Sequence, residues 1–301
     1  MHLTKHIALI KSLTVQNTLG EGIQWNSASG EICWTDIIDK KLYTYQPETG
    51  DLNAKIMPQA VCSFAFIANT DLMLIAFDTG IATYDPQNEQ LAWLYADLCD
   101  GVTERLNDGR VDRQGRFWVG SMMLRSVDED NPASGKLYCL DSDGELHVRE
   151  TGMHISNGLS WSPDGHTMYF ADSPRREIYA YDFDVTSGNL SHKRIFINTP
   201  PNTYPDGACV DADGFLWSAH WGASQVVRYS PDGNIDCVVK TPASQPSCPA
   251  FAGINLDILC VTSARQDLQA EQLNEQPRAG DVFLYQTDIR GISEQQYQAE
   301  I

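Results

Sequence analysis

The sequence has no long apolar run and little that predicts a helix. No uncharged apolar stretch reaches the roughly 18 residues that a transmembrane helix needs, so no membrane span is expected. The apolar run within MHLTKHIALIKSLTVQN at the start is short and interrupted by Lys11, which does not fit a secretory signal. No segment stands out with the apolar spacing of a helix. These absences predict a globular protein that is not made of long helices.

Positive charge is also scarce. Lys and Arg together number 21 against 40 Asp and Glu, which gives a formal net charge of −19. Nucleic acids and anionic membranes are bound through basic patches, so neither is expected as a partner. The acidic residues are spread along the chain, which is typical of a solvated surface, and we expect a monomer or a weak homo-oligomer.

Paired cysteine motifs and the usual catalytic loops are missing as well. The eight cysteines include no C-x-x-C pair, and several lie in apolar runs such as ICW and ILCV. They are predicted to be buried thiols of a protein in the reducing cytoplasm. No G-x-S-x-G turn and no phosphate-binding glycine loop occurs, which argues against serine hydrolysis and nucleotide binding.

What the sequence does contain is an internal repeat. A polar residue near a glycine is followed by an apolar residue four positions on, then by a glycine turn and an apolar strand. Four copies are clear: EGIQWNSASGEICWTD, NDGRVDRQGRFWVGS, NGLSWSPDGHTMYFAD and DGACVDADGFLWSAH. Weaker copies lie around Phe64 and Phe251. Each continues into further short alternating segments that end in Gly, Asp or Asn turns.

Six units of about 45 residues with several strands each predict an all-β, six-bladed β-propeller. Residues 1–301 are expected to form a single domain. A β-sandwich or jelly roll is the alternative, but neither repeats one signature six times. The last unit ends in GISEQQYQAEI, which is poor strand material. We therefore expect residues 6–15 to supply a strand to the last blade.

The repeat places four polar residues in one register. The first strand of a propeller blade lines the central channel, so residues in matching positions face one another. Carboxylates and carboxamides without His or Cys suit a hard cation such as Ca²⁺, Mg²⁺ or Mn²⁺, and Zn²⁺ less well. The alternative is that they cap strands and hold water. The four are Glu21, Asn107, Asn157 and Asp206, while the weaker copies offer Phe64 and Phe251 nearby.

These residues resemble the regucalcin, gluconolactonase and luciferin-regenerating enzyme family. The matching stretches are LGEGIQW, RLNDGRVDRQGRFWVGSM, ISNGLSWSPDGHTMYFADS and YPDGACVDADGFLWSAHWG. The resemblance implies a six-bladed propeller with one central divalent cation held by Glu21, Asn157 and Asp206. It also implies that a sugar is bound by Arg105 and Asn107, together with the neighbouring Asp108. Where some members have an acidic side chain on the sugar, this chain has Arg125.

The resemblance further implies hydrolysis of a small sugar lactone to the aldonic acid. A cation at such a site would polarise the lactone carbonyl, and Asp206 is the best candidate to accept the proton of the attacking water. Arg125 is either a solvated loop residue or a further contact to the substrate. Two other functions stay open: a metal-dependent esterase or phosphotriesterase on the same scaffold, and a Ca²⁺- or sugar-binding propeller without catalysis.

Overall fold

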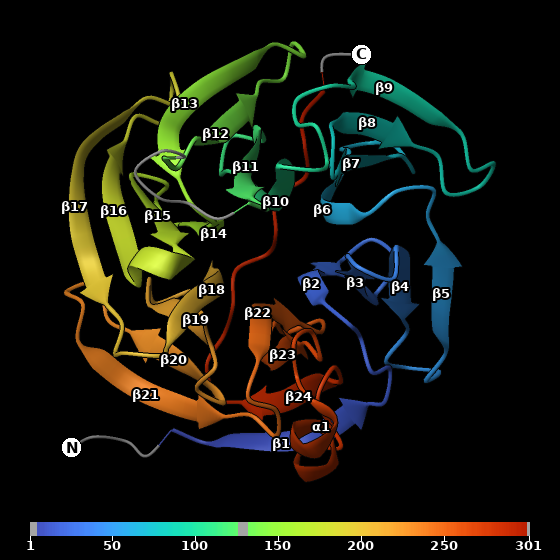
Figure 1. Cartoon of the computed structure of the whole chain (residues 1–301), viewed down its shortest axis with the longest axis vertical. Coiled ribbons are helices and arrows are strands. Elements are labelled where there is room, and N and C mark those ends of the chain that lie inside the picture. Colours follow the sequence, from blue (N-terminus) through green and yellow to red (C-terminus); the bar gives the residue numbers. More distant parts are fainter. Residues whose placement is uncertain (1–4, 126–131, 300–301) are drawn as a thin grey trace. The chain divides into compact units, whose positions relative to one another are not determined.

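A computed structural model describes residues 5–125 and 132–299. Within them the chain forms 24 β-strands, one short α-helix and one 3₁₀ turn. The strands make six four-stranded antiparallel sheets, which we call blades 1 to 6 in chain order (Figure 1). The number of blades and their order along the chain agree with the prediction from the repeat.

The chain divides into two compact units. Unit 1 comprises Met1–Pro58 and Pro200–Glu294, and unit 2 comprises Gln59–Thr199 and Gln295–Ile301. Each unit contains three blades. That residues 1–301 act as one domain stays a prediction.

Unit 2 contains blades 2, 3 and 4. Their first strands, β6, β10 and β14, contact one another in that order. The strands of blade 2 are β6 (Val61–Phe66), β7 (Met73–Phe77), β8 (Ile81–Tyr84) and β9 (Leu91–Tyr95). Those of blade 3 are β10 (Glu104–Val111), β11 (Phe117–Met123), β12 (Gly135–Leu140) and β13 (Leu146–Met153). Those of blade 4 are β14 (Ser156–Trp161), β15 (Thr167–Asp172), β16 (Glu177–Phe183) and β17 (Leu190–Asn198).

Unit 1 contains blades 1, 5 and 6. The first strand of blade 6 contacts the first strands of blades 1 and 5. The strands of blade 1 are β2 (Gly20–Asn26), β3 (Glu31–Asp36), β4 (Lys41–Tyr45) and β5 (Leu52–Ile56). Those of blade 5 are β18 (Tyr204–Val210), β19 (Leu216–Trp221), β20 (Gln225–Tyr229) and β21 (Ile235–Lys240). Those of blade 6 are β22 (Pro246–Ala252), β23 (Ile258–Ser263), β24 (Val282–Thr287) and β1 (Ile7–Leu13).

The outer strand of blade 6 comes from the start of the chain. β1 pairs antiparallel with β24, from Ile7 opposite Thr287 to Leu13 opposite Val282, and Figure 1 shows the blue strand at the edge of the red ones. The expectation that residues 6–15 complete the last blade is confirmed. The pairing joins residues that are far apart in sequence, and it covers an edge of β24 that would otherwise be exposed.

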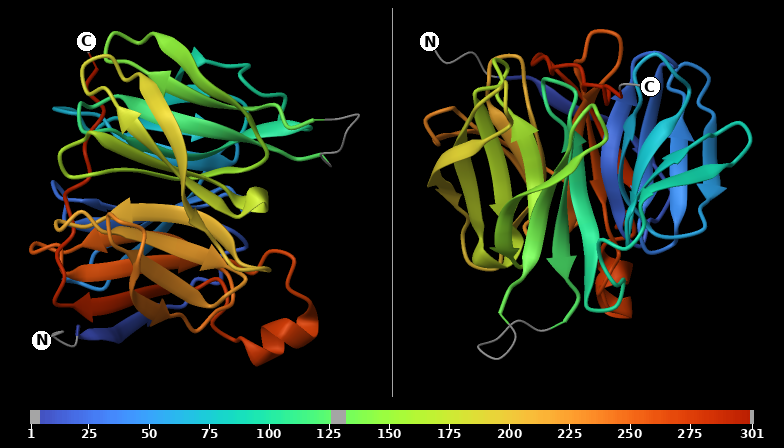
Figure 2. Two further views of the ribbon diagram at one scale, coloured as in Figure 1. Left: turned by 90° about the vertical axis from the view of Figure 1, so that its left-hand side faces the viewer. Right: turned by 90° about the horizontal axis from the view of Figure 1, so that it is seen from above.

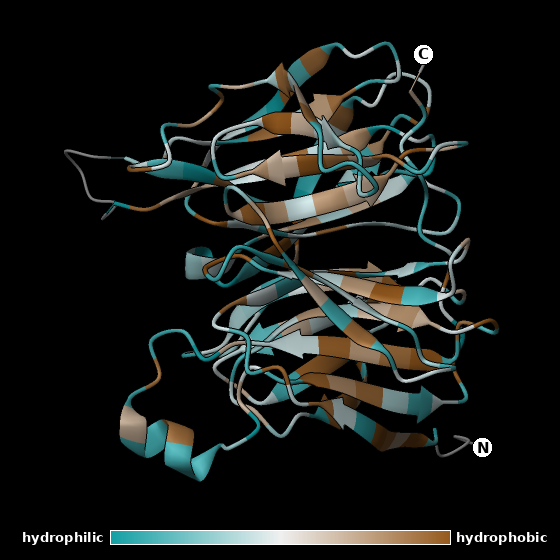
Figure 3. Ribbon diagram, turned by 90° about the vertical axis from the view of Figure 1, so that its right-hand side faces the viewer, coloured by the Kyte–Doolittle hydropathy of each residue, from teal (hydrophilic) through white to brown (hydrophobic). Residues whose placement is uncertain are grey.

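Local sequence explains the turns within the blades. The four glycines predicted at turns have φ angles of 70° at Gly30, 88° at Gly115, 77° at Gly165 and 83° at Gly214. Only glycine adopts this left-handed region without steric cost, so the turn positions follow from the sequence. Figure 3 shows apolar bands along the strands, whereas the loops that join them are mostly polar.

Tryptophans fill the interior of both units. Trp161 and Trp217 are 2% and 0% exposed, whereas Trp25 is only partly buried. Trp161 packs at 5.9 Å, between ring centroids, from Trp118 in blade 3. Trp217 packs edge-on against Phe251 of blade 6 at 5.5 Å. Large aromatic side chains therefore join neighbouring blades within each unit.

Blades 3 and 5 each bury an ion pair near the end of the first strand. In blade 3, Asp112 Oδ2 accepts hydrogen bonds from Trp118 Nε1 at 3.0 Å and from Arg116 Nε at 2.7 Å. In blade 5, Asp211 Oδ2 accepts from Trp217 Nε1 at 2.8 Å and from Arg228 Nε at 2.7 Å. Both carboxylates are fully buried, so each needs its arginine to offset the loss of water.

Two small elements were not predicted. The helix α1 (Ala270–Glu275) has no buried residue and projects from blade 6, as Figure 2 shows. The 3₁₀ turn η1 (Ser173–Arg175) follows β15. No helix in the described part of the chain is long and apolar enough to cross a membrane. The eight cysteines, all within that part, are free thiols, and all except Cys237 are buried, as predicted.

Candidate functional site

The pairing between the first two strands is irregular at the same place in every blade. In blade 3 the register shifts between Leu106 and Gly109, and in blade 5 between Pro205 and Ala208. Such β-bulges turn side chains away from the regular strand directions and are common beside active sites. The other four shifts lie between Glu21 and Gln24, Val61 and Ser63, Asn157 and Ser160, and Pro246 and Pro249.

The predicted polar register coincides with these bulges. Asn107 and Asp206 lie inside them, and Glu21 and Asn157 lie at their first residue. The expectation for blades 2 and 6 needs correction, because the bulges there enclose Cys62 in one case and Ser247 with Cys248 in the other. Phe64 and Phe251 come later in their strands and are buried core residues, at 0% and 4% exposed.

Unit 2 brings Arg105, Asn107 and Asn157 together. Arg105 Nη1 donates to Asn107 Oδ1 at 2.8 Å and to the carbonyl of Leu106 at 2.8 Å. Asn107 Nδ2 donates to Asn157 Oδ1 at 3.0 Å, and Asn157 Nδ2 donates to Ser173 Oγ at 2.8 Å. A continuous chain of side-chain hydrogen bonds thus runs from β10 through β14 to η1.

Asp108 points into the protein. Its Oδ2 accepts a hydrogen bond from the backbone N–H of Leu159 at 3.0 Å, which ties β10 to the bulge of β14. Burial is the main influence on this carboxyl group and raises its pKa, against the opposing effect of Arg110 and of backbone N–H groups. The prediction that Asp108 contacts the substrate stays a prediction, and its observed partner is the neighbouring strand.

Asp206 lies in a bulge that depends on the glycine after it. Asp206 is 7% exposed. A side chain on Gly207 would place its Cβ 2.8 Å from the Cα and Sγ atoms of Cys248 in β22. Only glycine lets β18 and β22 approach this closely, which explains why a glycine follows the carboxylate in this copy of the repeat.

The start of the first strand is held in the same way in blades 1 and 4. Asp36 accepts hydrogen bonds from the backbone of Thr18 at 2.7 Å and of Leu19 at 3.1 Å. In blade 4, Asp172 accepts from the backbone N–H groups of residues 154 and 155, each at 3.2 Å. Both carboxylates are buried, and each one fixes the segment that leads to a predicted ligand, Glu21 or Asn157.

Glu21 is half-buried at the start of its bulge. The backbone N–H of Gly22 donates to Glu21 Oε2 at 3.2 Å, and Gly22 has a φ of 60°. The left-handed backbone at this glycine turns the strand immediately after the carboxylate.

His220 lies on the strand beside Asp206. It is paired with Pro205, it is 1% exposed, and its Nε2 lies 3.2 Å from the hydroxyl of Tyr229. Burial lowers the pKa of His220 to about 4, so the ring is neutral at physiological pH. The hydroxyl of Tyr229 is a partner for the ring nitrogen within the protein.

Arg125 follows β11 and is half-buried. Its Nη2 donates to the carbonyl of Pro132 at 3.2 Å, which connects the two sides of the segment between β11 and β12. The prediction that Arg125 touches a substrate stays a prediction.

Ser173 is a further polar residue of this site that the sequence did not predict. This hydroxyl accepts the hydrogen bond from Asn157, yet no motif marks it. The available signal was the hairpin register: Asn157 is paired with Ala171, so the residues just after β15 lie beside Asn157.

Each unit contains oxygen donors of the kind that hard divalent cations prefer. Within unit 2, one lone pair of Asn157 Oδ1 accepts from Asn107, and a carbonyl oxygen has a second lone pair. Within unit 1, Glu21 and Asp206 supply carboxylates at matching positions of β2 and β18. In the described part of the chain no three His, Cys, Asp or Glu side chains gather to hold a metal, so an all-protein site there has to include a carboxamide or other oxygen donors.

Comparison with known proteins places the chain among lactonases and their relatives. Residues 19–265 match the SMP-30/Gluconolactonase/LRE-like region. The L-arabinolactonase of Azospirillum brasilense is 37% identical over 280 residues, which cover 92% of this chain and 91% of that protein. The 6-deoxy-6-sulfogluconolactonase of Pseudomonas putida is 30% identical over 280 residues, covering 92% and 94%.

A solved structure shows the same architecture. The calcium-binding protein regucalcin from Agrobacterium tumefaciens superimposes with a TM-score of 0.89 at 28% identity, covering 96% of this chain and 97% of that one. Together with the six four-stranded sheets, this likeness establishes an all-β, six-bladed β-propeller.

Proposed function

Since the chain belongs to the SMP-30/gluconolactonase/LRE-like family, we propose that it hydrolyses a sugar aldonolactone to the aldonic acid with one bound divalent cation. The observation that carries the proposal is the 37% identity to an L-arabinolactonase across 92% of the chain. The polar residues at the bulges of β2, β10, β14 and β18 support it, because they are hard oxygen donors and hydrogen-bonding groups.

We assign the cation to Glu21, Asn157 and Asp206. When bound there, Ca²⁺, Mg²⁺, Mn²⁺ or Zn²⁺ would supply Lewis-acid polarisation of the lactone carbonyl and lower the pKa of water. The two carboxylates supply the negative charge that a divalent cation needs, and the buried carboxamide adds a neutral oxygen. The cation is expected to be removable by a chelator.

Asp206 is the proposed general base. Water adds to the carbonyl carbon of the lactone, and the carboxylate of Asp206 accepts its proton. The ring C–O bond then breaks, and the proton is returned to the departing ring oxygen, which becomes a hydroxyl group of the acid. One water molecule is consumed, and the balance requires no other reactant.

Arg105 and Asn107 are the proposed contacts to the sugar hydroxyls, and Arg125 is a candidate further contact. The guanidinium of Arg105 uses Nη1 within the protein and has further N–H donors on Nε and Nη2. Neutral pentono- and hexonolactones are the expected substrates. A net charge of −19 supports a small-molecule partner rather than nucleic acid, and eight free thiols support a cytoplasmic location.

A panel of lactones tests the function. Acid release from pentono- and hexonolactones should exceed the spontaneous rate, fall to that rate with EDTA, and return when Ca²⁺, Mg²⁺, Mn²⁺ or Zn²⁺ is added. Aryl esters and phosphotriesters in the same assay test the esterase alternative. If the protein binds Ca²⁺ but accelerates none of these substrates, it is a binding propeller without catalysis and the proposal fails.

A further inference from the structure

The hydrogen-bond chain from Arg105 to Ser173 has a fixed polarity. A guanidinium group can only donate hydrogen bonds, so the atom of Asn107 that faces Arg105 at 2.8 Å is its carbonyl oxygen. The amide nitrogen of Asn107 therefore points the other way, where the backbone carbonyl of Ser156 accepts from it at 2.9 Å. That carbonyl is also unable to donate, which confirms the orientation from a second side.

The same polarity extends to Asn157. The Nδ2 of Asn107 donates to Asn157 at 3.0 Å, so Asn157 presents its oxygen to β10 and its nitrogen to Ser173 Oγ at 2.8 Å. An Asn157 amide turned by 180° would bring two N–H groups into opposition. All four side chains are at most 8% exposed, so bulk water cannot easily replace the lost hydrogen bonds.

The backbone around Asn157 is held by the same strand. Asn107 Nδ2 contacts the carbonyl of Ser156 on one side, and the carboxylate of Asp108 accepts the N–H of Leu159 on the other. Gly158 between them has a φ of 65°. Two consecutive residues of β10 thus fix both the backbone and the amide orientation of Asn157.

We propose that Asn107, oriented by Arg105, is a positioning residue that keeps the carbonyl oxygen of Asn157 available to a divalent cation. The inference rests on the proposed role of Asn157 as a ligand. The oxygen of a carboxamide binds a cation, whereas its NH₂ group carries partial positive charge and repels one. Without the chain of hydrogen bonds, the Asn157 amide would populate both orientations and the affinity for the cation would fall.

Asn107→Asp separates this role from a simple charge effect. The new carboxylate still pairs with Arg105 but can no longer donate, so the Asn157 amide turns its nitrogen toward it and its oxygen toward Ser173. We expect the Kd for Ca²⁺, measured by calorimetric titration of metal-free protein without substrate, to rise about tenfold. An added negative charge acting alone predicts the opposite sign. An unchanged or lower Kd would overturn the proposal.

A second background provides the matched control. In Asn157→Asp both side-chain oxygens are equivalent, so the orientation of the group no longer matters. Adding Asn107→Asp to this variant should leave the Kd unchanged or lower it through the extra charge. If the Kd rises by the same factor in both backgrounds, the effect does not come from the Asn157 amide and the proposal is wrong.

Three further variants keep the test decisive. Asn157→Ala should itself weaken Ca²⁺ binding; if it does not, the ligand assignment fails rather than the positioning role. Asn107→Ala removes the donor without adding a charge and should raise the Kd severalfold even if Asn107→Asp does not fold, as judged by thermal unfolding of the metal-free protein. Ser173→Ala is its control, because a hydroxyl pairs with either end of the Asn157 amide and its loss leaves the orientation set by Asn107. A folded Asn107→Ala with the wild-type Kd would contradict the proposal.

Discussion

Blades 3 and 5 contain matching stretches, RLNDGRVDRQGRFW and YPDGACVDADGFLW, and yet differ at both ends of the first strand. Near the end of the strand, the buried Asp112 and Asp211 each accept from a tryptophan and an arginine. In blade 3 the arginine is Arg116, two residues before Trp118. In blade 5 it is Arg228 from β20, which stacks 3.7 Å from the ring centroid of Phe215.

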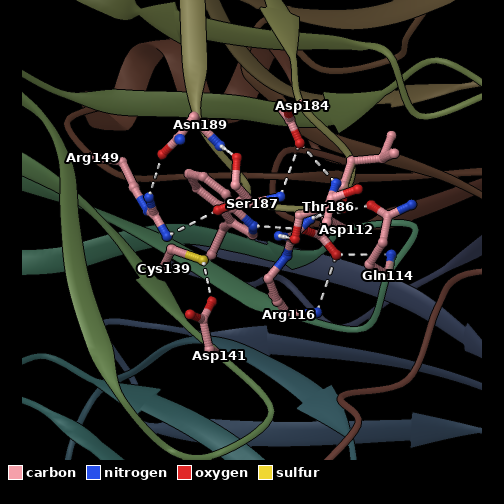
Figure 4. Close-up of polar contacts among 12 residues, drawn as sticks. Asp112, Gln114, Arg116, Cys139, Asp141, Arg149, Asp184, Thr186, Ser187 and Asn189 are labelled. Atoms are coloured by element: carbon pink, nitrogen blue, oxygen red, sulfur yellow. Dashed lines mark hydrogen bonds and ion pairs between the residues drawn. The ribbon is translucent and has the colours of Figure 1, made fainter.

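The two arginines also differ in what else they bind. Arg116 Nη2 donates to the carbonyl of Val185 at 2.9 Å, so it connects blade 3 to a loop of blade 4, and Figure 4 shows Arg116 near Asp112 and the loop residue Thr186. Arg228 Nη1 instead donates to Asp236 within its own blade at 2.7 Å. The same buried contact is therefore built in two ways, because a carboxylate needs only some guanidinium group nearby.

At the start of the first strand the two blades differ in the type of polar group. Blade 3 has the carboxamide of Asn107, whose oxygen and nitrogen are both bonded to neighbouring side chains. Blade 5 has the carboxylate of Asp206 in the same register. A supporting contact can be rebuilt from another strand, but a group that accepts a proton or holds a cation has to occupy its own position.

The largest effect is expected when the carboxylate of blade 5 is replaced by a carboxamide like that of blade 3. Asp206→Asn keeps the shape of the side chain but removes its charge and its capacity to accept a proton. We expect kcat for the best lactone to fall by about 10²–10⁴, the usual contribution of a general base, with weaker metal binding as well. Stopped assays at saturating metal measure this.

Asp213→Asn in the same blade is the control, since that carboxylate side chain is 74% exposed and should be dispensable for turnover. Activity of Asp206→Asn within a few-fold of wild type would rule out both assigned roles of Asp206.

Removal of the buried carboxylate should lower the free energy of unfolding more in blade 3 than in blade 5. In Asp112→Ala, the remaining hydrogen bonds that the structure describes for Arg116 go to neutral acceptors, including Gln114 Oε1 at 3.3 Å and the carbonyl of Val185, and Asp184 acts on it through its charge alone. In Asp211→Ala, Arg228 keeps the carboxylates of Asp236 and Asp213. We expect the free energy of unfolding to fall by about 4 kcal/mol in the first case and about 2 kcal/mol in the second.

Urea denaturation followed by tryptophan fluorescence gives both values. The exposed Asp232 on a turn of blade 5 offers a matched Asp→Ala control, with an expected change within about 0.5 kcal/mol. Equal losses for Asp112→Ala and Asp211→Ala would show that the extra carboxylates of blade 5 do not compensate.

Local signals in the sequence were sufficient for much of this architecture. Gly turns, alternating strands and a repeated register predicted six blades, the strand donated by residues 6–15, and the positions of Asn107, Asn157 and Asp206. The pairing of Arg228 with Asp211 was not predictable, because it joins residues on different strands without a motif. The bulge shift that places Cys62 rather than Phe64 in register is also a property of strand pairing, and so is the contact of Asn157 with Ser173.

A pH-dependent difference between the blades is expected from His220. It is paired with Pro205 just before the bulge, where blade 3 pairs Leu106 with Ser121, a side chain that does not titrate in this range. Burial lowers the pKa of His220 to about 4 in the folded protein. In the unfolded chain the same ring takes up a proton near pH 6.5, so protonation between these two values favours unfolding. Stability from this group is complete above about pH 6.5 and is lost as the pH falls toward 4, by up to about 3 kcal/mol.

His220→Met removes the titrating group and keeps a side chain large enough to fill its place, so that blade 5, like blade 3, has no titrating residue at this position. Its free energy of unfolding from urea curves should be slightly lower than wild type at pH 7.5, because Tyr229 loses a partner, but should decline less between pH 6.5 and 4.5. Parallel declines for variant and wild type over this range would mean that other groups cause the acid sensitivity.

The smallest effect is expected at Arg125, where blade 5 has the short side chain of Ser224 at the corresponding position after its second strand. Arg125→Ala removes donors that reach the carbonyl of Pro132 and, if it is a contact, the substrate. One partly exposed contact is worth a two- to fivefold change at about 0.5–1 kcal/mol, so KM should rise by that factor while kcat and the Kd for metal stay the same. The shift should differ among lactones, because only those with a hydroxyl or carboxylate in reach lose a partner. Equal kcat/KM for variant and wild type across the whole panel would leave Arg125 as a support for its loop alone.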